Sequence, residues 1–140
     1  MKMNILSSKA KKLKAYTLQE VLVVLVIIGI LVLLALPSLL PLISRAKSTE
    51  AQLQLEHIYT MEKQYFYMYS KYSDSFEDIG FEHVKLTSEG GRANYQIEII
   101  QADNAGFIAT ASAIVDFDGD GTLNVWEIDQ EKNLKEKVKD

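Results

Sequence analysis

The sequence contains no cysteine, so no disulfide can hold its folded part together. It has two histidines, His57 and His83. Without a third histidine or a cysteine to join them, neither a zinc site nor a catalytic histidine site is expected, and each is interpreted as a surface or packing residue. No Ser-His-Asp set, glycine-rich phosphate loop or pair of catalytic carboxylates can be assembled. We therefore expect a protein that is not an enzyme.

Negative charge is missing from two parts of the amino-terminal region, and the second of them has no charge at all. The first 14 residues contain no acid, and residues 21–36 contain no charged or polar side chain. The apolar run continues to Ile43, interrupted by Pro37, Ser38 and Pro41. If this run forms a helix, with a rise of about 1.5 Å per residue, it is long enough to cross a hydrocarbon layer of roughly 30 Å. The lysines that precede it are Lys2, Lys9, Lys11, Lys12 and Lys14.

These flanks predict the orientation of the membrane segment. A basic amino end stays in the cytoplasm, so the carboxyl-terminal hundred or so residues are expected outside. The run is longer than the apolar region of a secretory signal peptide, which disfavours cleavage after it. We expect a single-pass membrane protein with its amino terminus in the cytoplasm and an exported head.

Glu20 stands at the head of the apolar run, where a carboxylate is costly and is usually paired or functional. One interpretation is an interfacial acid that reaches headgroup water and has no role. The other requires cleavage between Ala15 and Tyr16, which creates an α-ammonium one helical turn from Glu20. A staggered neighbouring helix then brings its ammonium to this carboxylate and neutralises both charges.

The stretch KAYTLQEVLVVLVIIGILVLLALP resembles the start of type IV prepilins and of the pseudopilins of type II secretion systems. That family has a basic leader, Thr-Leu after the cleavage site, a Glu five positions into the mature chain and a Pro near the end of a long apolar helix. Ala15 stands where the family usually has Gly, and Tyr16 where Phe is commonest. The residues in register are Tyr16, Thr17, Leu18, Glu20, Gly29 and Pro37.

The resemblance implies a structural role. Residues 1–15 would be removed by a prepilin peptidase, Tyr16 would be N-methylated, and the mature chain would polymerise into a helical filament through the pilus or type II secretion assembly machinery. The filament would be a homo-oligomer at the cell surface or in the periplasm. Two alternatives stay open: a secretion pseudopilin, and a signal-anchored calcium-binding module that does not polymerise.

Residues 16–43 are predicted to form the transmembrane or filament-core helix, and residues 44–72 an amphipathic continuation of it. Pro37 and Pro41 lack amide donors and are expected to kink or loosen this helix. The apolar face is marked by Ala51, Leu55, Ile58, Tyr65 and Tyr69, at helical spacing. A cluster of aromatic residues lies in the same stretch: Tyr59, Tyr65, Phe66, Tyr67, Tyr69 and Tyr72. Core and subunit packing is favoured for it over an electron path or a platform for nucleic-acid bases.

Residues 73–140 are predicted to form a small globular head. Residues 95–100 and 107–115 have the composition of strands, and Asn104 to Gly106 suit a hairpin that pairs them antiparallel over the amphipathic helix. The tail, residues 130–140, alternates Lys with acids and is expected to be a solvated end. The predicted fold class is therefore α+β and pilin-like.

The segment DFDGDGTLNVWE, residues 116–127, matches the calcium-loop pattern D-x-D-x-D-G-x5-E. In this pattern Asp116, Asp118, Asp120 and Glu127 supply carboxylates, and Thr122 supplies its backbone carbonyl. The glycine at position 121 permits the turn, and position 124, an Asn, would contribute through water. The alternative is a solvated hairpin, because Asp-Gly pairs are strong turn formers. Because LNVWEI favours a strand, Asp129 or water can take the place of Glu127.

Acidic residues dominate the part of the chain that would be exported. The whole sequence has 15 basic and 19 acidic residues, and removal of the five lysines of the leader lowers its net charge from −4 to about −9. An acidic surface is repelled by phosphate backbones. Nonspecific nucleic-acid binding is therefore not expected.

Overall fold

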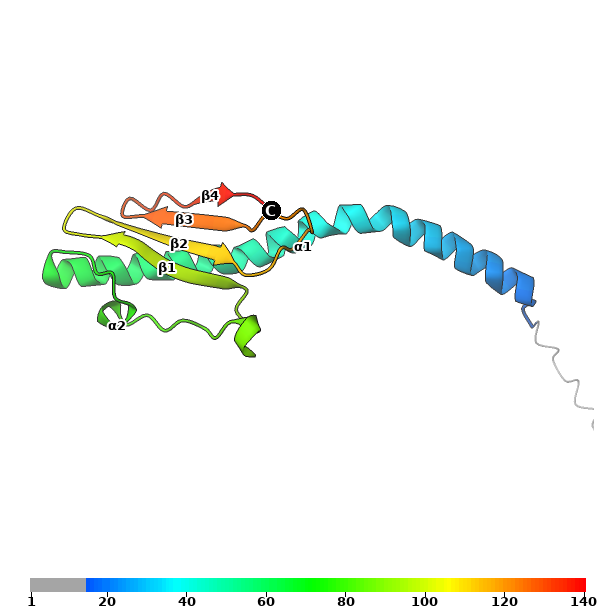
Figure 1. The fold of residues 1–140 in the computed structure, drawn as a ribbon, viewed down its shortest axis with the longest axis horizontal. Coiled ribbons are helices and arrows are strands. Elements are labelled where there is room, and N and C mark those ends of the chain that lie inside the picture. The colour runs from blue at the N-terminus through cyan, green and yellow to red at the C-terminus, as the bar shows by residue number, and fades with distance from the viewer. Residues whose placement is uncertain (1–14) are drawn as a thin grey trace, which may run out of the picture. The chain divides into compact units, whose positions relative to one another are not determined.

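The structure, a computed structural model, describes residues 15–140, so the predicted leader lies outside the described residues except for Ala15. A long helix comes first and strands follow (Figure 1). In chain order the elements are α1 (Leu18–Tyr69), α2 (Phe76–Ile79), the 3-10 helix η1 (Thr87–Glu89), β1 (Tyr95–Ala102), β2 (Phe107–Ala113), β3 (Val125–Asp129) and β4 (Lys135–Val138). This order confirms the predicted α+β class.

The chain divides into two compact units, one that ends at Leu36 and one that runs from Pro37 to Asp140. The helix α1 contributes residues to both units. It remains helical through Pro37 and Pro41, and the predicted loosening there stays a prediction. The helix ends at Tyr69, three residues before the expected end. Ser70 adopts a positive φ of 58° while its amide donates to the carbonyl of Phe66 at 2.7 Å, which closes the last turn.

The four strands form one antiparallel sheet in the order β1-β2-β3-β4. The predicted pairing of the first two strands is confirmed, with Tyr95 opposite Ala113 and Ala102 opposite Phe107. The register shifts between Ile99 and Gln101, which leaves Ile100 unpaired and 63% exposed. A turn stabilised by Asp103 joins the strands, because its carboxylate accepts the amides of Ala105 and Gly106 at 2.7 and 2.9 Å.

The side chains of residues 130–140 are mostly exposed, as expected for a solvated end, but the prediction missed a strand within this tail. Lys135 to Val138 form the edge strand β4, which pairs with β3. Its four side chains are exposed, so no apolar alternation marks it in the sequence. Besides the backbone pairing with β3, side-chain contacts hold it: Glu127 on β3 pairs with Lys135 and Lys137, and the buried Asn124 donates to the carbonyl of Val138 at 3.0 Å.

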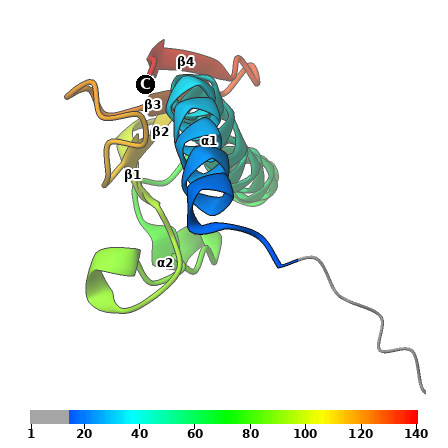
Figure 2. The same ribbon diagram turned by 90° about the vertical axis from the view of Figure 1, so that its right-hand side faces the viewer.

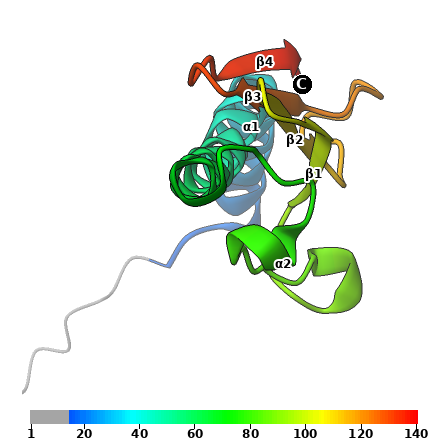
Figure 3. The same ribbon diagram turned by 90° about the vertical axis from the view of Figure 1, so that its left-hand side faces the viewer.

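The core of the carboxyl-terminal unit lies between one face of α1 and one face of the sheet. Figures 2 and 3 show the strands as a single layer beside this helix. Leu55 and Ile58 are fully buried against Phe107, Ala109 and Ile128. Part of the aromatic cluster joins this core. The ring of Phe66 stacks on that of Tyr72 with centroids 4.8 Å apart, and the rings of Tyr72 and Phe107 have centroids 5.2 Å apart. Tyr67 and Tyr69, at 81% and 59% exposed, lie outside it.

This packing predicts that Leu55→Ala destabilises the head far more than Leu53→Ala. Leu55 is 0% exposed, whereas Leu53, two residues earlier on α1, is 64% exposed. Truncation of a buried leucine leaves a cavity and costs about 2 to 5 kcal/mol, and truncation at the exposed position is expected to cost less than about 0.5 kcal/mol. Urea unfolding of the full chain in detergent micelles measures both values. Equal losses for the two variants would contradict the packing.

Candidate functional site

The first turn of α1 is closed by a reciprocal pair of hydrogen bonds between Thr17 and Glu20. The amide of Thr17 donates to Oε2 of Glu20 at 2.7 Å, and the amide of Glu20 donates to Oγ1 of Thr17 at 3.3 Å. The Thr17 hydroxyl also donates to Oε2 at 3.0 Å. This is a capping box, which satisfies two amides that a helix start otherwise leaves free. Glu20 is thus placed in the first turn of the helix, four residues after the 85% exposed Tyr16.

The apolar run that follows is not buried by other described parts of the chain. Its large apolar side chains between Val21 and Ile43 are 37% to 70% exposed. By length and composition, α1 qualifies as a helix that can cross a membrane. An exposed apolar surface of this extent requires a cover, which a lipid bilayer or other apolar helices can supply.

The acidic loop forms a tight turn after β2. Both oxygens of Asp116 accept backbone amides, from Gly119 at 2.6 Å and from Gly121 at 2.7 Å. Gly119 and Gly121 have φ of 83° and 89°, a region that side-chain-bearing residues rarely adopt. Asp118 and Asp120 each accept the amide two residues ahead, at 3.0 and 2.7 Å.

A fourth carboxylate, that of Asp140, joins this loop. Its oxygens accept the amides of Phe117 and Asp118 at 3.0 and 3.3 Å. One oxygen from each of Asp116, Asp118, Asp120 and Asp140 lies within 4.8 Å of the others, a spacing at which the four can share one cation. Burial, together with the neighbouring carboxylates of Asp140 and Asp120, raises the pKa of Asp118. By contrast, the amides of Gly121 and Gly119 lower the pKa of Asp116. The cluster therefore carries closely spaced negative charge.

The two acids predicted to complete the site, Glu127 or in its place Asp129, lie elsewhere. Glu127 is buried on β3, where its oxygens pair with Nζ of Lys135 at 3.2 Å and of Lys137 at 3.1 Å. Burial opposes its ionisation, but the bonds from Lys137 and Lys135 prevail and lower its pKa. Asp129 accepts the amides of Glu131 and Asn133 at 2.9 and 3.0 Å in the turn after β3. Neither carboxylate belongs to the group around Asp116.

Asn124 takes a structural position. It is 0% exposed, accepts the hydroxyl of Tyr95 at 2.8 Å and donates to Glu136 at 2.7 Å. Its side chain thereby joins β1 to β4 in place of the predicted water-mediated contact. Thr122 is placed beside the acidic group, with its amide donating to Asp120. Sequence reasoning missed Asp140, because no spacing rule joins a residue that far along the chain to the loop.

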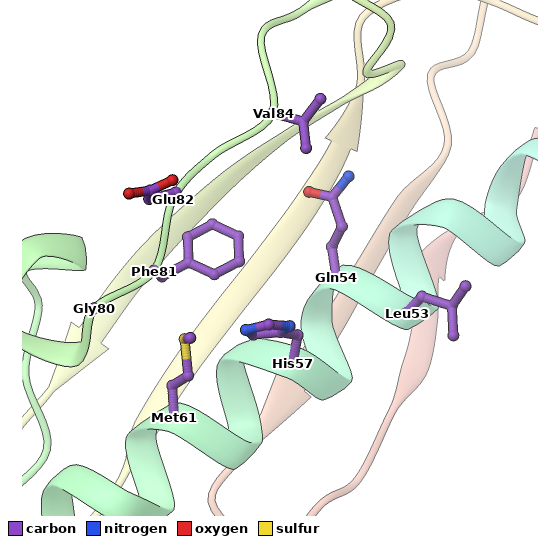
Figure 4. A pocket seen from close by; sticks show the side chains of 8 residues that line it. All are labelled: Leu53, Gln54, His57, Met61, Gly80, Phe81, Glu82 and Val84. Atoms are coloured by element: carbon purple, nitrogen blue, oxygen red, sulfur yellow. The ribbon is translucent and has the colours of Figure 1, made fainter.

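A cavity of about 450 Å³ lies between α1 and residues 80–84 (Figure 4). His57 lines it and packs edge-on against Phe81, with ring centroids 5.8 Å apart. His83 lies near by, and its Nε2 accepts the amide of Ile97 at 3.2 Å. Both histidines are thus engaged in packing or backbone contacts. Among the residues that line the cavity, Glu82 is the one acid, and it has no nucleophile or metal-ligand cluster beside it.

The chain is similar to a curated protein. It is 33% identical over 90 residues to the type IV major pilin protein PilA of Myxococcus xanthus (strain DK1622). The similarity supports the type IV pilin family. The match covers 64% of this chain and 39% of that pilin, so the chain spans about two fifths of its relative's length. No protein-family model matches the sequence. The long amino-terminal helix and the antiparallel sheet behind it are consistent with a pilin-like fold.

Proposed function

We propose that the chain is a structural subunit of a type IV pilus, made as a precursor and polymerised through its amino-terminal helix. The observation that carries this proposal is a single carboxylate, Glu20, at the start of an exposed apolar helix in a chain similar to a major pilin. An apolar helix of this length is covered by lipid before assembly and by neighbouring helices afterwards. The same similarity favours a surface pilus over a secretion pseudopilus.

The proposed assembly pairs opposite charges at the amino-terminal ends of two neighbouring chains. After processing between Ala15 and Tyr16, the new α-ammonium of one copy pairs with Glu20 of the next. Breaking a buried ion pair by removal of one partner costs about 3 to 5 kcal/mol, since the other charge stays buried alone. The proposed partners are therefore further copies of the chain, a prepilin peptidase, the inner membrane and the pilus assembly machinery.

Glu20→Ala is expected to insert into the membrane normally and to lose most filament assembly. Removal of a charge eases insertion but leaves the ammonium of Tyr16 without its partner. Immunoblots of the sheared filaments and of the membrane fraction measure the filament yield and the amount of inserted protein. Gln19→Ala is the control, because it changes the adjacent polar residue and leaves the charge intact. A normal filament yield from Glu20→Ala would rule out the pairing.

Processing provides a second test. We expect mass spectrometry of the native amino terminus to find a mature chain that begins at N-methylated Tyr16. Ala15→Gly, which restores the residue usual in the family, should speed the removal of the leader in a pulse-chase experiment. An intact Met1 or a start at another residue would count against a filament subunit and favour a signal-anchored protein.

We also propose that the acidic loop binds calcium through Asp116, Asp118, Asp120 and Asp140, with Thr122 adding its backbone carbonyl. Calcium prefers six to eight hard oxygen ligands, and the grouped carboxylates offer several at one point. Without a cation their charges repel one another. Asp140 takes the place predicted for Glu127, because the two lysines on β4 already neutralise Glu127. The bound ion would fasten residue 140 to the loop, in a head that has no disulfide.

Calcium is expected to raise the melting temperature of the full chain in detergent micelles. A hundredfold excess over Kd contributes about 2.7 kcal/mol, which corresponds to several degrees for a head of this size. Asp118→Asn and Asp140→Asn should each abolish most of the shift between calcium and chelator. Glu127→Gln should lower stability in both conditions and keep the shift, which makes it the matched control. Identical melting in calcium and chelator would contradict the site.

A further inference from the structure

Glu62 is a buried carboxyl group in the head that neither proposed function uses. It lies on the buried face of α1 and is 0% exposed. One oxygen, Oε2, accepts the amide of Ser73 at 3.1 Å, and the other, Oε1, is buried without a hydrogen-bond partner. Among residues 15–140, no lysine or arginine lies within ion-pair distance of it. Its ionised form would therefore be a buried charge with one donor, which is a costly arrangement.

The bond to Ser73 holds the segment that connects α1 to α2. Ser73 is itself buried, donates from Oγ to Asp78 at 2.9 Å and accepts the amide of Ser75 at 3.1 Å. Ser75 is the amino-terminal cap of α2. The carboxyl group of Glu62 thus stands at the base of a short network that extends from α1 to α2 through residues 73–78.

The charged groups around this position offer Glu62 no compensation. On the connecting segment, Asp74 repels its negative charge, and on α2 the carboxylate of Asp78 is engaged by Ser73. On α1, the adjacent Lys63 donates to the hydroxyl of Tyr72 at 3.1 Å. From the sheet, the buried side chains that face α1 are apolar except for Tyr95, whose hydroxyl donates to Asn124. Burial, with a smaller contribution from Asp74 and against the bond from Ser73, raises the pKa of Glu62 to about 7.

We propose that Glu62 is a pH-dependent latch, which in its neutral form holds residues 70–79 against α1 and which weakens when it ionises. In the released segment the carboxyl group meets water and returns to the ordinary pKa of 4.5. Below pH 4.5 both states are protonated, so the latch has its full strength. Between pH 4.5 and 7 the carboxyl group is ionised in the released state but not in the latched state, so the latched state loses stability relative to the released one. Above pH 7 both states are ionised, and the loss of stability is complete. The latch is thus strong in acid and weak above neutrality.

Hydrogen exchange on the full chain in detergent micelles tests the latch. The protection factor of the Ser73 amide, corrected for the intrinsic exchange rate, should fall by up to about 300-fold from pH 4 to pH 8, since each unit of the pKa difference is a factor of ten. Glu62→Gln has the same shape, keeps an acceptor for Ser73 and cannot ionise, so its profile should be flat. Glu56→Gln, at an exposed position on α1, should behave as the parent chain does.

A flat profile in the parent chain, or the same fall in Glu62→Gln, would overturn the latch. A direct titration covers the case in which Glu62→Gln does not fold. The side-chain carboxyl carbon of Glu62, followed by NMR in the parent chain, should titrate with a midpoint near 7. A midpoint near the ordinary 4.5 would overturn the proposal as well. Because both measurements use the monomeric chain, failure of the latch leaves the filament proposal standing.

Discussion

The head depends on the burial of one face of α1, marked by Ala51, Leu55 and Ile58, against one face of a four-stranded sheet. An antiparallel sheet that is covered on one side alternates buried and exposed residues, and β1 follows this rule from Tyr95 to Glu98. The central strand β2 presents Ala109 and Ala111, both fully buried, toward the helix. With no cysteine in the sequence, the side-chain contacts of this layer and the polar links of Asn124 carry the stability that a disulfide supplies in other exported domains.

The elements that can be predicted from the sequence are those in which buried apolar residues recur at a regular spacing. The stripe on α1 recurs every three or four residues and β1 alternates, so both are recognisable in the sequence. The strand β4 was not, because its four side chains are exposed and its position depends on partners elsewhere in the chain. Lys135 and Lys137 pair with a glutamate on β3, and such cross-strand charge pairs leave no periodic signal in a single sequence.

The same distinction holds for the candidate sites. The alternate positions of Asp116, Asp118 and Asp120 are a local pattern, and the structure brings these three side chains together. Glu127 fits the pattern by spacing, yet β3 extends the chain where a calcium loop of the helical type would turn into a helix. The strand directs Glu127 toward the lysines of β4, and the loop meets Asp140 instead. Glu62 shows the same limit, because an acid among apolar helix residues does not reveal from sequence whether it is buried or paired.

In the proposed assembly, Thr17 of the same chain and the ammonium of a neighbouring chain both seek the carboxylate of Glu20. In the single chain, Glu20 is already satisfied by the amide and hydroxyl of Thr17. A cap of this kind is worth about 1 kcal/mol, whereas an unpaired ammonium within a filament core costs about 3 to 5 kcal/mol. A carboxylate oxygen has two lone pairs, and Oε1 of Glu20 makes none of the bonds with Thr17, so one oxygen can keep the cap while the other meets the neighbour's ammonium. The cap then fixes the rotamer of Glu20 before the neighbour arrives, which lowers the entropy cost of pairing.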